Sequence, residues 1–129
     1  GYLHECARVL APAGTLVVTT PNRLTFSPHD AAPLNPFHTR ELTAAELVDA
    51  VSAAGFVVTR LLGVAHGGRL RRWERRHGSI VAAQIATTAG AWPSRLRRVV
   101  GGVRAADFEV VARNVDAALD LVVVAYRRP

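Results

Sequence analysis

The sequence predicts an α/β fold, because three strand-like apolar runs alternate with segments of helical spacing. The first run, Leu16–Thr20, is apolar or β-branched without alternation, which is typical of an interior strand covered on both faces of a sheet. The second run is Phe56–Leu62 and the third is Asp120–Arg127. With 129 residues and 50% hydrophobic content, the chain is long enough to bury the core of one domain.

A helix is predicted over residues 1–11, where apolar side chains recur at helical spacing before Pro12, Ala13 and Gly14 end it. Pro21 cannot donate to a sheet ladder, so the first strand stops there and Asn22 lies at its carboxyl end. The helix begins without a capping residue and the sequence contains no Met. We therefore expect the sequence to be the carboxyl-terminal part of a longer chain.

Residues 22–41 are predicted to form a long loop, because three prolines and two histidines occur there and neither helical nor strand periodicity persists. The loop follows the carboxyl end of a strand, which is where open α/β sheets bind ligands. We expect it to form one wall of a small-molecule site.

The next helix is predicted from Thr43, the N-cap, with Glu46 completing a capping box and Gly55 ending the helix in a left-handed conformation. The strand Phe56–Leu62 then completes the αβ half of a parallel crossover unit. Residues 63–104 are predicted to form two or three short helices, and Phe108–Val111 a short strand.

Two boxes carry a resemblance to a known family. ECARVLAPAGTLVVTTPN, residues 5–22, resembles the pattern around the fifth strand of class I S-adenosylmethionine-dependent methyltransferases. NPFHTREL, residues 35–42, is similar to the box that follows in one branch of that family. Ala13 stands where the family usually has Gly, and the turn accommodates it if the φ of Ala13 is negative.

The resemblance implies the carboxyl-terminal part of a Rossmann-like methyltransferase sheet: its last three strands, the final one antiparallel, with a helical insertion before the last strand. Residues 1–62 would then form the helix-strand-loop-helix-strand core, residues 63–105 a helical cap, and residues 106–129 the terminal strand region. All three belong to one domain, whose amino-terminal half we expect to be the missing partner of this chain.

The resemblance also implies methyl transfer to a small-molecule acceptor, with S-adenosyl-L-methionine as the cofactor of the full-length parent. The sequence contains no Gly-rich cofactor turn, and neither Gly67-Gly68 nor Gly101-Gly102 follows a predicted strand in the required way. We therefore expect no cofactor-binding residue here, and no activity from this chain alone. The rival interpretation is a non-catalytic α/β fragment that only packs or binds a partner.

Five residues at the expected active edge are predicted to bind the acceptor: Asn22, Asn35, His38, Arg40 and His66. The same interpretation makes Glu41, three residues after His38, a further contact to the acceptor. His38 is also a candidate general base, because an imidazole titrates near neutral pH. In the alternative interpretation, Asn35 and His38 bond the backbone of their own loop, Glu41 belongs to the next helix start, and His66 is a surface residue. The histidines have no metal-ligand spacing, so we expect no metal.

An arginine cluster surrounds Trp73 and has two interpretations: it holds an anionic acceptor or phosphate, or it is the solvated face of an amphipathic helix with Leu70 and Trp73 turned inward. The chain carries a net charge of +6 supplied by Arg alone, without Lys, which indicates compositional bias and makes a nucleic-acid partner unlikely on this basis. No apolar run reaches transmembrane length and no signal peptide is evident, so the predicted location is the cytoplasm.

Overall fold

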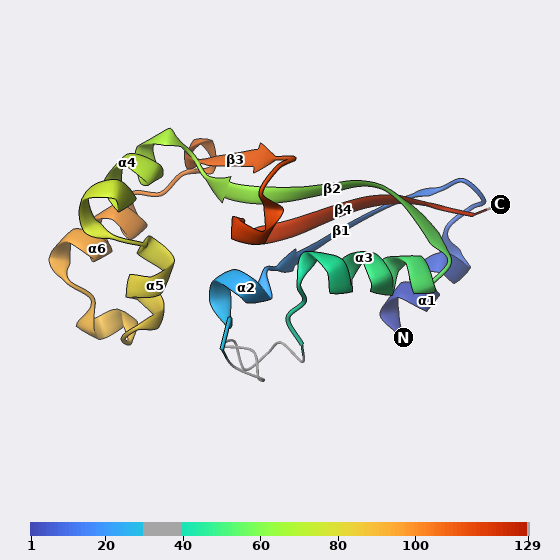
Figure 1. Ribbon diagram of the computed structural model, residues 1–129, viewed down its shortest axis with the longest axis horizontal. Helices are drawn as coiled ribbons and strands as arrows, with labels where there is room; N and C mark the ends of the chain where they lie inside the picture. Colours follow the sequence, from blue (N-terminus) through green and yellow to red (C-terminus); the bar gives the residue numbers. More distant parts are fainter. Residues whose placement is uncertain (30–39, 129) are drawn as a thin grey trace. The chain divides into compact units, whose positions relative to one another are not determined.

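The computed structural model describes residues 1–29 and 40–128 (Figure 1). The chain divides into two compact units, and each is considered by itself. The first unit comprises Gly1–Val64 and Val110–Pro129, and the second comprises Ala65–Glu109. Strands and helices are both present, so the α/β class predicted from the sequence is confirmed.

The strands are β1 (Thr15–Pro21), β2 (Phe56–His66), β3 (Phe108–Val111) and β4 (Asp120–Arg127). The helices are α1 (Tyr2–Val9), α2 (Arg23–Phe26), α3 (Ala44–Ala53), α4 (Gly68–His77), α5 (Ile80–Ile85) and α6 (Ser94–Gly101). Three short 3₁₀ turns are η1 (Ala89–Ala91), η2 (Ala105–Asp107) and η3 (Val115–Ala117). The second strand is four residues longer than predicted, because its strand conformation continues through Gly63 to His66.

The four strands form one sheet in the order β1-β4-β2-β3. β4 runs antiparallel to both of its neighbours, as predicted for the final strand, so β1 and β2 point in the same direction on either side of it. Val123 pairs with Val18 on one side and with Leu61 on the other. A register shift between Val58 and Arg60 marks a bulge in β2.

β1 is an edge strand among the described residues, so the prediction of an interior strand covered on both faces is wrong for this chain. Its only sheet partner in the described ranges is β4. Leu16 is buried, whereas the side chain next to it, Val17, is 59% exposed. The apolar run indicated burial on both faces, but helices of this unit cover only one of them.

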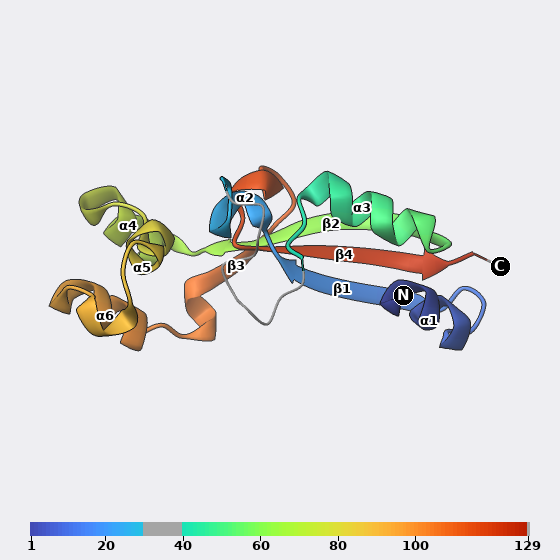
Figure 2. The ribbon, with the colours of Figure 1, turned by 90° about the horizontal axis from the view of Figure 1, so that it is seen from below.

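The covered face of the sheet packs against α1 and α3, which lie on the same side of it (Figures 1 and 2). Leu47 and Val51 of α3 are fully buried against Phe56, Leu121 and Val123 of the strands. Each such side chain contributes about 1.5–3 kcal/mol through removal from water. The helix α1 supplies only partly buried side chains to this core, and its Tyr2 and Val9 are largely exposed.

The turns around α3 and β1 follow the sequence in one case and depart from it in another. The capping box of Thr43 and Glu46 is confirmed, and Gly55 adopts a φ of 93° as predicted. Ala13, in contrast, has a φ of 59°, so the expectation of a negative φ is wrong. The turn keeps the left-handed conformation that suits Gly and forces Ala into it, which costs about 1 kcal/mol.

The sequence predicted a loop over residues 22–41. The structure differs at the beginning of this segment, where α2 is a short helix. Asn22 caps α2, since its side-chain oxygen accepts a hydrogen bond from the backbone of Leu24. A four-residue helix is too short to show an apolar period, so only the cap could have indicated it.

The second unit has a core of its own, made by α4, α5 and α6. Leu70, Ile80, Leu96 and Val99 are buried together, and Trp73 and Trp92 pack against them. The inward position predicted for Leu70 is therefore confirmed. No helix in the described part of the chain is long and apolar enough to cross a membrane.

Candidate functional site

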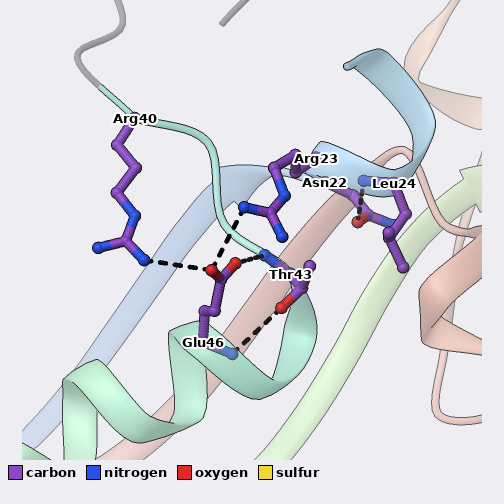
Figure 3. Close-up of polar contacts among 6 residues, drawn as sticks. All are labelled: Asn22, Arg23, Leu24, Arg40, Thr43 and Glu46. Atoms are coloured by element: carbon purple, nitrogen blue, oxygen red, sulfur yellow. Dashed lines mark hydrogen bonds and ion pairs between the residues drawn. The ribbon is translucent and has the colours of Figure 1, made fainter. Parts of the chain in front are cut away.

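Asn22 lies directly after β1 and is completely buried. Its oxygen caps α2 by accepting from the Leu24 amide at 3.1 Å (Figure 3). Its amide nitrogen donates to the backbone oxygens of Asp116 and Ala118, both at 2.9 Å. Both amide protons are thereby engaged, so Asn22 fixes the exit of β1 to the segment that leads into β4.

Glu46 collects three cationic or N–H donors at the start of α3 (Figure 3). Its carboxylate accepts from the Thr43 backbone amide at 2.8 Å, from Arg23 at 3.3 Å and from Arg40 at 3.2 Å. The Thr43 amide is the main cause that lowers the pKa of Glu46, with Arg40 and Arg23 adding to it. The Glu46 carboxylate therefore links Arg23, directly after Asn22, to Arg40 and Thr43, which precede α3.

A second polar connection lies beside it. The Ser27 hydroxyl donates to the carboxylate of Glu41 at 2.8 Å, and both residues are almost fully buried. Asn22 forms a parallel bridge with Leu42, and the Arg23 amide donates to the Leu42 oxygen at 3.1 Å. We call these contacts and those of Glu46 the loop base, because they bring together the two ends of the segment between β1 and α3.

His66, at the end of β2, belongs to the second unit. Its Nδ1 lies 3.1 Å from a carboxylate oxygen of Glu74, and its side chain is only 12% exposed. The ring of Phe108 lies 5.9 Å away, and Arg71 donates to the backbone oxygen of His66. His66 is thus a held, nearly buried ring rather than a freely exposed surface residue.

The predicted acceptor-binding residues fall into three groups. Asn22 and Arg40 lie at the loop base of the first unit. His66 lies in the second unit. Asn35 and His38 are outside the described residues, so neither their hydrogen bonds nor the proposed base can be placed. The acceptor-binding roles of all five stay predictions.

Sequence reasoning missed the buried pair of Ser27 and Glu41 and the second role of Glu46. The sequence suggests Glu41 either as an acceptor contact or as part of a helix start, and Glu46 only as a member of a capping box. The available signal was indirect, since a Ser and a Glu separated by a Pro-containing loop have no fixed spacing in sequence. Only the closing of the loop brings the two side chains to hydrogen-bond distance.

Gly67 and Gly68 do follow a strand directly, contrary to the expectation, because β2 extends to His66 and α4 begins at Gly68. The close approach at Gly67 is nevertheless internal. Its amide donates to the Asp107 oxygen at 2.6 Å, and a Cβ on Gly67 would come within 2.8 Å of that oxygen. The space beside Gly67 is therefore filled by the protein's own backbone.

Within the described ranges, no group of three or more His, Cys, Asp or Glu side chains could hold a metal ion.

Curated proteins of two organisms are similar to this chain over nearly its whole length. No protein-family model and no solved structure matches the sequence. The chain is 50% identical, over 98% of its length, to the probable S-adenosylmethionine-dependent methyltransferase Rv3030 of Mycobacterium tuberculosis. It is 48% identical, again over 98% of its length, to a probable S-adenosylmethionine-dependent methyltransferase of Mycolicibacterium smegmatis. The resemblance to S-adenosylmethionine-dependent methyltransferases that the two boxes predict is confirmed.

The chain covers 48% of the first of these relatives and 51% of the second. It therefore spans about half the length of the curated relatives it matches.

Proposed function

We propose that this chain is part of an S-adenosylmethionine-dependent methyltransferase and that it contributes the side of the active site that holds a small-molecule acceptor. The observation that supports this proposal most is the 50% identity to a probable methyltransferase over 98% of the chain. The cofactor in the name of that relative is the cofactor we assign to the complete enzyme.

The loop base supports the choice of the acceptor side. In open α/β sheets, ligands bind beyond the carboxyl ends of the strands, and the loop base lies at that end of β1. Ser27, Glu41 and Glu46 act in this proposal as positioning residues, because they fix both ends of the segment that contains Asn35 and His38. Asn22 attaches the loop base to the segment that leads into β4.

The chemistry that this side must supply is modest. The cofactor, when bound, provides an activated methyl group, and transfer is a direct displacement by the acceptor. The protein aligns the acceptor atom, which avoids much of the entropic cost of the reaction. We assign removal of the acceptor proton to His38, and contacts to the acceptor to Asn35 and Arg40.

The sheet leaves room for the rest of such an enzyme. The outer edge of β1 pairs with no strand in the part of the chain that is described, and Val17 on the uncovered face is 59% exposed. We propose that the remaining half of the parent pairs with this edge, covers this face and carries the cofactor site. The length of the relatives, about twice that of this chain, is consistent with such a half.

A chimera tests the assignment: this chain replaces the matching region of the Mycobacterium tuberculosis relative, and calorimetry measures binding of S-adenosylhomocysteine. The chimera is expected to bind with micromolar affinity, and the 129-residue chain alone is expected not to bind. Micromolar binding by the isolated chain would show that the cofactor site is here after all. A folded chimera that does not bind would refute the methyltransferase assignment.

The positioning role is tested in the same chimera with Glu46→Gln, and with Asp49→Asn as the matched control. Asp49 is exposed on the same helix and makes no ion pair among residues 1–29 and 40–128. Glu46→Gln is expected to raise the KM for the acceptor while S-adenosylhomocysteine binding is unchanged, because the loop base loosens. Equal effects of the two substitutions on the KM would rule out a specific role for Glu46.

A further inference from the structure

The net positive charge of this sequence comes from one of its two units. Residues 65–109 contain nine arginines against three acidic residues, whereas the rest of the chain contains seven of each. Compositional bias toward Arg acts on a whole sequence, so it does not explain why the excess lies in one compact unit. The arginines of the second unit are therefore the place to look for a use of the charge.

A cleft lies between α4 and α6 in this unit. Its volume is about 340 Å³, which is within the usual range for small-molecule sites. The residues that line it are Arg69, Trp73, His77, Arg95, Arg98 and Val99. Val99 is buried and Trp73 packs against the same core, so the cleft has an apolar floor and a cationic rim.

Two of the five arginines of α4, Arg69 and Arg71, already have a carboxylate partner. Asp107 accepts two bonds of 2.6 Å from Arg69, and these bonds are the main cause that lowers the pKa of Asp107 to about 2. Arg71 pairs with Glu109. The remaining acid of the unit, Glu74, contacts His66 and the Ile80 amide. None of the three acids is therefore left to neutralise the cleft.

Arg95 and Arg98 are the uncompensated charges of the cleft. Neither guanidinium group makes a hydrogen bond or an ion pair with any residue that the structure describes. They are three residues apart on one face of α6, and α6 contains no acidic residue. Like charges at this spacing repel by a few tenths of a kcal/mol, and a bound anion would relieve that repulsion.

The aromatic side of the cleft offers a flat surface. The rings of Trp73 and His77 are stacked, with centroids 4.5 Å apart and planes at 27°. His77 is oriented by a 2.9 Å contact between its Nδ1 and the Trp73 backbone oxygen. The indole N–H of Trp92 is satisfied by two backbone oxygens, whereas that of Trp73 has no acceptor among the described side chains and backbone.

We propose that this cleft binds a small organic oxyanion, a phosphate or carboxylate attached to a flat apolar group. The guanidinium groups of Arg95 and Arg98 would bind the oxyanion, since Arg matches the geometry of both carboxylate and phosphate. The apolar group would lie on Trp73. The proposal does not depend on the methyltransferase assignment, because it uses only residues within the second unit.

A neighbouring hollow shows what distinguishes this cleft. That hollow, of about 360 Å³, is lined by Arg69, Gly102, Arg104, Ala106 and Asp107. The Asp107 carboxylate already occupies the guanidinium of Arg69 there. An incoming anion would be repelled by Asp107, so we assign the site to the cleft that contains Arg95 and Arg98.

The test is a titration of the 129-residue chain with phenyl phosphate, benzoate and benzyl alcohol, followed by calorimetry and by the NMR signals of the two indole N–H groups. Saturable binding of phenyl phosphate or benzoate is expected, with the Trp73 signal shifted and the Trp92 signal unmoved. The stronger of the two anions identifies the oxyanion. Benzyl alcohol has the ring without the charge and is expected not to bind.

The double variant Arg95→Gln/Arg98→Gln is expected to weaken binding of the preferred anion about tenfold or more, because it removes charge-assisted hydrogen bonds. The matched control, Arg75→Gln/Arg97→Gln, removes the same charge from exposed residues outside the cleft and is expected to change binding less than twofold. Circular dichroism confirms that both variants are folded.

Three results would overturn the proposal. Equal losses in the two double variants would indicate only a general surface potential. Equal affinity for benzyl alcohol would remove the role of the charge. Binding to an oligonucleotide or to phosphatidylglycerol vesicles that phenyl phosphate does not displace would assign the arginines to a macromolecular surface instead.

Discussion

The two units of this chain use charge in different ways. In the first unit, arginines and acids are equal in number, and the ionic contacts of Glu46 organise a loop. In the second unit, arginines outnumber acids three to one, and two of the cleft arginines have no partner in the described structure. A sequence-wide net charge therefore says little about function until it is assigned to a folded unit.

The largest expected effects come from the cores and test whether the units fold separately. Phe56→Ala in the first core is expected to cost about 3–5 kcal/mol, and Leu96→Ala in the second about 2–5 kcal/mol, because each leaves a cavity among buried side chains. Hydrogen exchange is the measurement, and each substitution should lower amide protection mainly in its own unit. Val110→Ala, at a site 67% exposed, serves as a control with little expected effect. Equal loss of protection in both units would contradict separate folding.

Asn22→Ala is expected to cost about 2 kcal/mol, because it removes a helix cap and the hydrogen bond to the Asp116 backbone oxygen. The Ala118 backbone oxygen keeps the Thr25 hydroxyl as a donor. Urea denaturation measures the change. Gln84→Ala removes a partly buried amide that makes no side-chain hydrogen bond within the described residues, and it should cost much less. A cost for Asn22→Ala below about 0.5 kcal/mol, which is typical of a surface substitution, would show that these hydrogen bonds are dispensable.

Two carboxylates, one in each unit, are expected to give opposite pH dependences. Arg69 lowers the pKa of Asp107 to about 2, so its stabilising contribution is present above the unfolded value near 3.8 and is lost as pH falls toward 2. Burial raises the pKa of Asp120, so its favourable contribution is present below the unfolded value and is lost as pH rises through the folded one.

Asp107→Asn should therefore lower the melting temperature at neutral pH, and the effect should fade in acid. Asp120→Asn should raise the melting temperature at neutral pH, and that effect should also fade in acid. The melting temperatures are compared by circular dichroism at pH values from about 2 to about 7, a range that includes the titration of both carboxylates. Shifts of the same sign in the two variants would contradict the assigned causes.

The smallest expected effect is a gain. Ala13→Gly should stabilise the first unit by about 0.5–1 kcal/mol, because Ala13 holds a φ of 59° that Gly adopts without strain. Ala11→Gly, at a nearby exposed residue without positive φ, should be neutral or slightly destabilising. If both substitutions have the same effect in chemical denaturation, strain at Ala13 is not significant.

The sequence predicted those elements whose signals are local. Thr43, Glu46 and Gly55 indicate the start and end of α3 within a few residues, and the structure contains both caps. The apolar runs likewise indicate β1 and β4 correctly as strands. These predictions succeed because a cap or a strand period is satisfied by neighbouring residues alone.

Features that depend on distant partners could not be predicted. Nothing in the run Leu16–Thr20 says whether a second strand of this chain will pair with its outer edge. The pairing of Ser27 with Glu41 requires the loop to close first. The contacts of Glu74 with His66 and the Ile80 amide likewise depend on how distant segments pack.

The open edge of β1 has a practical consequence for work on the isolated chain. Along this edge, the amide and carbonyl groups have no strand partner within residues 1–29 and 40–128, and Val17 beside them is exposed. Such an edge is a template on which another extended segment can hydrogen-bond. Two copies of the chain can satisfy each other's edges in this way, so self-association should increase with protein concentration. Aggregation of the isolated chain at high concentration would then be caused by the seven residues of β1.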